Sequence, residues 1–144
     1  MKRKLRNSLI IKNILIHFSL NPKIQLLTFN FQPFKFGLVL NPKDSVESLV
    51  KNHALFKLEA VQIMSVNPGF QGSVFIPETL TKIQQLRQLG YRKSILLDGG
   101  INDKSLPQIL ELKYKPDILT IGSFLTKANN LSKKITYLKS LAVV

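Results

Sequence analysis

The pattern that most constrains this chain is a repeated alternation of short, apolar, β-branched runs with longer amphipathic segments, which begins near residue 35. Such alternation is typical of βα units built around a parallel sheet. It predicts an α/β fold with a parallel sheet covered by helices. The expected strands are residues 36–40, 61–66, 94–97 and 118–121.

Local signals place helices between these strands. Pro77 suits a first helical position and Gly90 suits a C-terminal stop, so a helix is expected over residues 77–89. Asp44 and Glu47 have the spacing of a capping box at the start of an earlier helix. Two further helices are expected over residues 106–112 and 131–141.

Residues 1–34 do not follow the regular series. Within them, residues 10–18 fit a strand or a helix, and residues 27–34 have poor helix character and contain Pro33. We therefore expect two parts, a basic and poorly matching N-terminal segment (1–34) and a series of βα units (35–144).

Charge is distributed unevenly along the chain. The formal net charge is +13, and residues 1–43 hold eight Lys and Arg residues and no acid. A basic excess favours polyanionic partners such as nucleic acid, anionic lipid or phosphorylated metabolites.

The absence of cysteine excludes disulfides and thiolate metal sites. No apolar run reaches the roughly 18 residues of a membrane span, so we expect a cytoplasmic protein that does not cross a membrane.

A polar or glycine-rich turn directly follows each expected strand. In a parallel βα array these turns share the rim at the carboxyl ends of the strands, where barrel active sites form. Glycines there let backbone N–H groups approach an anion, so the set predicts binding of a phosphate-bearing ligand. Tight turns alone would also explain a single glycine pair. The four turns begin at Asn41, Asn67, Asp98 and Gly122.

Asp98 is the acid best placed for chemistry, because an apolar run carries it to a strand end before two glycines. A carboxylate there can ligate a divalent metal or move a proton next to a carbonyl. A turn or helix-capping role fits the local sequence equally well. Met64 is expected to pack in the core or to shield a carbanion near the rim, and His17 and His53 are expected to be structural and surface residues.

Three motifs then occur in order: IMSVNPGF at residues 63–70, LDGGIN at 97–102 and IGS at 121–123. In this combination the chain resembles the ribulose-phosphate 3-epimerase family over roughly residues 35–127. The resemblance implies a partial (β/α)8 TIM barrel of about four C-terminal βα units, equivalent to strands five to eight. It also implies an isomerase of the pentose phosphate pathway that interconverts D-ribulose 5-phosphate and D-xylulose 5-phosphate.

The resemblance further implies that Asp98 is one of two acid/base aspartates and a ligand of a divalent cation (Zn, Fe, Mn or Co), whose other ligands are expected outside this chain. Gln71 stands where the family has glycine, and Ser73 where it usually has glutamine, so a side chain at residue 71 is expected to crowd the phosphate loop. The residues implied to line the substrate and its phosphate are Met64, Gly69, Phe70, Gln71, Gly72, Gly99, Gly100, Gly122 and Ser123.

The preferred interpretation is thus a truncated epimerase that is inactive by itself. Two alternatives are an epimerase for another ketose phosphate and a non-catalytic remnant that binds nucleic acid through residues 1–43, the latter being least favoured. A half-barrel would expose an edge strand and an apolar face, which predicts self-association or pairing with a complementary half-barrel.

Overall fold

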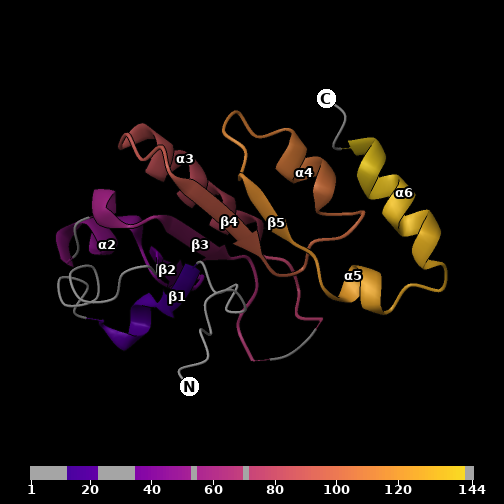
Figure 1. Cartoon of the computed structure of the whole chain (residues 1–144), viewed down its shortest axis with the longest axis horizontal. Helices are drawn as coiled ribbons and strands as arrows, with labels where there is room; N and C mark the ends of the chain where they lie inside the picture. The colour runs from indigo at the N-terminus through magenta and orange to yellow at the C-terminus, as the bar shows by residue number, and fades with distance from the viewer. Residues whose placement is uncertain (1–12, 23–34, 53–54, 70–71, 142–144) are drawn as a thin grey trace, which may run out of the picture.

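The computed structural model describes residues 13–22, 35–52, 55–69 and 72–141. Within these ranges, five parallel strands form one sheet in which each strand pairs with the next along the chain (Figure 1). The strands are β1 (Asn13–His17), β2 (Lys35–Leu40), β3 (Ala60–Met64), β4 (Ser94–Asp98) and β5 (Ile118–Thr120).

Helices follow the strands in alternation. In the described ranges, three 3₁₀ turns accompany them, η1 (Phe18–Leu20), η2 (Leu55–Lys57) and η3 (Pro77–Leu80). The α-helices are α2 (Val46–Asn52), α3 (Thr81–Gln88), α4 (Leu106–Leu110), α5 (Ser123–Thr126) and α6 (Leu131–Leu141). The predicted α/β class is therefore confirmed.

The four expected strands are confirmed to within two residues at each end, and the last helix is confirmed at both bounds. Of residues 10–18, for which a strand or a helix was left open, Asn13–His17 is a strand that pairs in parallel with β2, and Phe18 begins η1. The described sheet thus has five strands where four were expected. The division of the chain at residue 35 stays a prediction, since most of residues 1–34 lie outside the described ranges.

The two faces of the sheet differ in burial. Along β3, Val61 and Ile63 are fully buried under the helices, whereas Gln62 and Met64 on the opposite face are partly exposed. On that opposite face the Ile118 side chain is 49% exposed. The helices α3 and α4 lie above the strands in the view of Figure 1. The core therefore lies between the sheet and these helices, and the other face is only partly covered.

The ends of the helices follow local rules, with one correction. The expected stop at Gly90 is confirmed: its φ is +88°, its N–H donates to Arg87 O, and the N–H of Tyr91 donates to Leu86 O, which is a Schellman motif. The expected capping box at residues 44–47 is wrong by one residue. Ser45 Oγ accepts from the N–H of Ser48 at 3.1 Å. The Asp44 carboxylate instead accepts from the backbone N–H of Asn41 at 2.7 Å.

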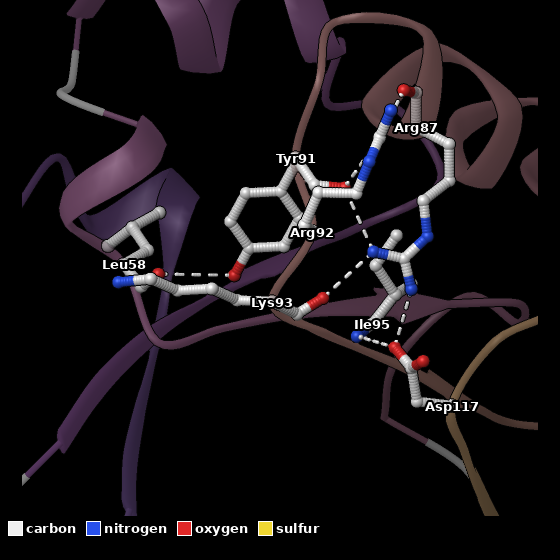
Figure 2. A network of polar contacts seen from close by, with 7 residues as sticks. All are labelled: Leu58, Arg87, Tyr91, Arg92, Lys93, Ile95 and Asp117. Atoms are coloured by element: carbon white, nitrogen blue, oxygen red, sulfur yellow. Dashed lines mark hydrogen bonds and ion pairs between the residues drawn. The ribbon is translucent and has the colours of Figure 1, made fainter.

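Arg87 at the end of α3 holds the starts of two strands together (Figure 2). Its guanidinium donates to the carbonyls of Tyr91 and Lys93, each at 2.9 Å, and pairs with Asp117 at 2.6 Å. Asp117 directly precedes β5 and also accepts from the backbone N–H of Ile95 in β4 at 2.7 Å. The turn before β4 is thereby tied to the segment that leads into β5.

Tyr91 adds a second connection at this end of the sheet. Its side chain is fully buried, and its hydroxyl donates to Leu58 O at 3.2 Å, as Figure 2 shows. Burial raises the pKa of the Tyr91 hydroxyl well above its ordinary value. Burial therefore favours the neutral hydroxyl, the form that donates to Leu58 O.

Replacing Arg87 should cost more stability than replacing a nearby exposed arginine. Arg87→Met removes the hydrogen bonds to the carbonyls of Tyr91 and Lys93 and the cation that pairs with Asp117, which predicts a loss of about 2–4 kcal/mol in the free energy of unfolding. Arg92→Met is the control: Arg92 donates to Arg87 O at 2.8 Å, but its side chain is exposed, so its loss should cost less than about 1 kcal/mol. Urea unfolding followed by circular dichroism measures both, and equal losses would show that the Arg87 contacts contribute little.

Candidate active site

A cavity of about 420 Å³ opens at the carboxyl ends of β3, β4 and β5. The strand register places Met64 beside Asp98, and Asp98 beside Thr120, so three neighbouring strands bring their last residues to its wall. The described residues that line it are Met64, Val66, Pro68, Gly69, Gly72, Ser73, Asp98, Gly99, Gly100, Ile101, Thr120, Gly122 and Ser123.

Asp98 ends β4 and is half-buried in this wall. Its carboxylate accepts a hydrogen bond from the side-chain amide of Gln62, with 3.1 Å between Nε2 and Oδ2. The same amide nitrogen lies 3.4 Å from the sulfur of Met64. Burial raises the pKa of the Asp98 carboxyl above its ordinary value. The arrangement can therefore hold an oriented carboxyl group that takes up and releases a proton.

The turn after β4 is packed closely against the turn after β3. Gly99 has φ +114°, and a Cβ built on it would lie 2.5 Å from Val66 Cγ2. Gly100 has φ +65°, and a Cβ there would lie 3.0 Å from the backbone of Phe75. The buried Ser65 hydroxyl donates to Gly99 O at 2.6 Å. Both glycines are thus needed for the close approach of these two turns, whatever they bind.

The turn after β2 is held in place by a buried lysine, and its residues are not among the described residues that line the cavity. The buried Lys82 of α3 donates from Nζ to Asn41 O at 2.7 Å and to Pro42 O at 2.9 Å. Burial lowers the pKa of Lys82, and the nearby Asp44 opposes that shift. Asn41 Oδ1 is buried and has no hydrogen-bond partner among the described residues. Three of the four expected turns line this cavity, and the Asn41 turn is not among its described lining residues. That all four turns form one site stays a prediction.

The cavity brings together most of the residues expected from the sequence, namely Met64, Gly69, Gly72, Asp98, Gly99, Gly100, Gly122 and Ser123. Phe70 and Gln71 lie outside the described residues. Their roles in binding and catalysis, like those of the residues in the wall, stay predictions. The expectations did not include Gln62 or five lining residues, Val66, Pro68, Ser73, Ile101 and Thr120. Gln62 had one signal, a polar residue inside an apolar strand. Val66, Pro68 and Ile101 lie within the quoted motifs, Thr120 directly precedes one, and Ser73 was named only as a departure from the family.

The described residues do not by themselves fit a divalent metal. Among them no group of three or more His, Cys, Asp or Glu side chains could hold a metal ion. Asp98 is the one acid among the described residues of the cavity wall, and a protein site for such a cation ordinarily takes several ligands. His17 ends β1, and β2 and β3 lie between it and β4.

In the same described ranges, no helix is both long and apolar enough to cross a bilayer.

The raised pKa of Asp98 gives a pH-dependent expectation. Because the folded state holds this proton more tightly than the unfolded chain, ionisation of Asp98 should lower the free energy of unfolding as the pH rises from the ordinary aspartate value through the raised one. Gln62→Leu removes a donor to the carboxylate and should raise the pKa further. Carbon-13 NMR of the aspartate carboxyls measures both midpoints, and a wild-type midpoint at or below the ordinary value of about 3.9 would contradict the expectation.

Alanine substitution separates backbone conformation from close packing at the glycine turns. Gly90→Ala meets open space and carries only the cost of a positive φ, about 1 kcal/mol. Gly99→Ala carries that cost and a clash with Val66, so its loss should be larger, about 2–4 kcal/mol. Urea unfolding of the two variants gives the difference. A loss of stability for Gly99→Ala no greater than for Gly90→Ala would show that the turns after β3 and β4 can separate without cost.

Comparison with known proteins then places the chain. The model of the "Ribulose-phosphate 3 epimerase family" matches residues 12–125, so the match begins with β1 and earlier than the expected residue 35. Curated proteins named ribulose-phosphate 3-epimerase are among its relatives. The one from Buchnera aphidicola subsp. Baizongia pistaciae is 41% identical over 67% of this chain and 42% of its own length.

The relative from Bacillus subtilis is 33% identical over 75% of this chain and 50% of its own length. That from Escherichia coli K12 is 32% identical over 74% of this chain and 47% of its own length. The chain thus spans about half the length of the curated relatives that it matches. Because the family match covers most of its residues and contains every described strand, this chain belongs to the ribulose-phosphate 3-epimerase family.

Proposed function

We propose that this chain carries the C-terminal part of the family's (β/α)8 barrel and contributes to the interconversion of D-ribulose 5-phosphate and D-xylulose 5-phosphate. In this proposal β2 to β5 are equivalent to strands five to eight, and β1 to strand four. Support comes from the parallel order of the five strands and from a family match that already includes β1.

The observation that carries the proposal is the carboxyl of Asp98, half-buried at the end of β4 and facing a cavity rimmed by glycine turns. Epimerisation removes the proton at C3, next to the C2 carbonyl, from one face of the sugar and returns a proton to the other face. A carboxyl whose pKa is raised by burial is closer to the working pH, which suits a group that both accepts and donates a proton.

Asp98 can serve one face of the sugar only. It is the one acid that the described residues contribute to the cavity wall, so the second acid/base group is expected from outside them. In this proposal the Gln62 amide keeps one oxygen of Asp98 engaged and leaves the other toward the cavity. Met64, beside Asp98 in the register, keeps water from the carbanion that forms at C3.

The phosphate of the sugar is expected at the glycine turns. Gly72, Gly122 and Ser123 line the same cavity as Asp98 and come from the segments after β3 and β5. Barrel enzymes frequently bind phosphate at the loops after their last two strands. Glycines let backbone N–H groups approach such an anion closely. This arrangement would place the phosphate at one end of the cavity and C3 near Asp98.

A complementary fragment is the partner that we propose. An eight-stranded barrel needs three strands beyond the five described here, whereas a second copy would bring five. The partly exposed face of the sheet, with Ile118 49% exposed, is the face that a closed barrel buries. Self-association is the weaker candidate, because a second copy would bring more strands than the barrel lacks. A cytoplasmic location stays an expectation.

Two other functions can be separated by experiment. An epimerase for another ketose phosphate would use the same cavity, so nothing in the described wall favours one sugar length. Nucleic-acid binding through residues 1–43 would depend on Lys2, Arg3, Lys4 and Arg6, which lie outside the described residues. Such binding would weaken steeply with salt, and its absence in a titration with DNA or RNA eliminates it.

Exchange of the C3 proton tests the proposed function. The chain is mixed with the first half of the Bacillus subtilis relative in D₂O, with Zn, Fe, Mn or Co added singly, and proton NMR follows loss of the C3 signal of D-ribulose 5-phosphate. We expect exchange in the mixture and little in either piece alone. Asp98→Asn should lower the rate about 100-fold or more, because it removes a general acid/base group.

Asp103→Asn is the matched control, since Asp103 is an exposed aspartate five residues further on whose ion pair with Lys134 lies at the surface. It should keep the rate within about twofold. Exchange that survives Asp98→Asn would remove Asp98 from the chemistry. A six-carbon ketose phosphate that exchanges faster than D-ribulose 5-phosphate would favour the alternative epimerase.

A further inference from the structure

The amino group of Lys127 lies close to one of the turns that line the cavity. It directly follows α5, and its backbone N–H donates to Ser123 O at 3.0 Å. Its amino group reaches the turn after β3, where Nζ lies 3.8 Å from the position that a Cβ on Gly72 would occupy. Gly72 and Ser123 both line the cavity. The cation therefore lies beside the Gly72 part of the cavity wall, although Lys127 is not itself among the described lining residues.

The charge of Lys127 is not used elsewhere in the described part of the chain. The ion pairs found there involve the basic residues Lys35, Arg87, Lys93 and Lys134, and Lys127 is in none of them. Among the described residues of the cavity wall none is basic, and Asp98 is acidic. An anionic ligand would be repelled by Asp98, so a cation at the glycine end of the cavity offsets that repulsion.

Gly72 leaves room for a ligand beside the ammonium group. Its φ is +89°, a conformation that L side chains rarely adopt. Among the described residues other than its chain neighbours, Lys127 Nζ is the one heavy atom within 4 Å of the position that a Cβ would occupy. An oxygen of a small anion can therefore contact the ammonium and the backbone of the turn together. Lysine suits such a role, because its ammonium is a compact charge on a flexible stem with three donors.

We propose that Lys127 is the cationic contact for the phosphate group of the ligand and makes binding in this cavity depend on a phosphate monoester. This inference rests on the proposed function for the location of the phosphate. It adds a charged side chain to a site otherwise formed by glycine turns and Ser123. The ammonium holds the phosphate end and takes no part in proton transfer at C3.

Binding measurements on four forms of the full chain test the inference. The forms are the wild type, Lys127→Met, Lys127→Arg and the control Lys139→Met, which removes an equal charge from an exposed position on α6. The probes are inorganic phosphate, D-ribulose 5-phosphate and unphosphorylated D-ribulose. Nitrogen-15 NMR reports affinity and location through the amides of Gly72, Gly122 and Ser123, and circular dichroism checks that each variant is folded.

We expect Lys127→Met to weaken binding of both phosphate probes roughly five- to tenfold, the size of one charge-assisted contact at a partly exposed site. Lys127→Arg should retain most of the affinity, and Lys139→Met should stay within about twofold, as expected for an exposed charge. Binding of D-ribulose should be the same in all forms. In the complemented enzyme Lys127→Met should raise KM while kcat changes little.

The outcomes separate this inference from the proposed function. Phosphate binding that is equal in the wild type and Lys127→Met overturns the role of Lys127 and leaves the glycine site standing. Binding that depends on Lys127 without any C3 exchange in the complemented protein supports the inference and counts against the epimerase. A wild type that binds neither phosphate probe, alone or complemented, overturns both.

Discussion

The parallel register of β3, β4 and β5 is the constraint on which the rest of the structure depends. Met64 pairs with Asp98 and Asp98 with Thr120, so the last residues of three strands reach the same edge of the sheet. Because parallel strands all run in one direction, every turn that follows them starts from that edge. The carboxyl of Asp98 therefore meets the glycine turns that follow β3 and β5, which lie far from it in the sequence. The helices that pack on one face of the sheet bury its apolar side chains and so hold the register.

The parts of the fold that follow local rules could be predicted from the sequence. β-Branched apolar runs gave four strands, and the spacing of Leu131, Ile135 and Leu138 gave the last helix. The strand Asn13–His17 could not be settled in this way, because a short apolar run suits a strand or a helix equally well. Its pairing with β2, more than twenty residues further along the chain, decides between them. The cap at Ser45 was missed because Asp44 and Ser45 are both good capping residues.

The composition of the candidate site was predictable, but the contacts that hold it were not. Asp98 and the glycines follow apolar runs directly and can be recognised where they stand. Gln62 reaches Asp98 across 36 residues of sequence, and Lys82 binds backbone carbonyls that carry no side-chain signal. The proximity of Lys127 to Gly72 could not be predicted either, since a lysine after a short helix is ordinarily a solvated surface residue. Each of these contacts exists only once distant segments have packed together.

The network around Arg87 lies at the starts of β4 and β5, whereas the cavity lies at the ends of the same strands. The groups that stabilise the sheet and the groups that face the ligand are thus at opposite ends of each strand. Substitutions that alter the ligand-facing turns need not disturb the Arg87 contacts. For protein engineering this separation is favourable at cavity positions other than Gly99 and Gly100, whose close packing the fold needs. The remaining turn residues can be diversified in a library while the arginine anchor keeps the sheet assembled.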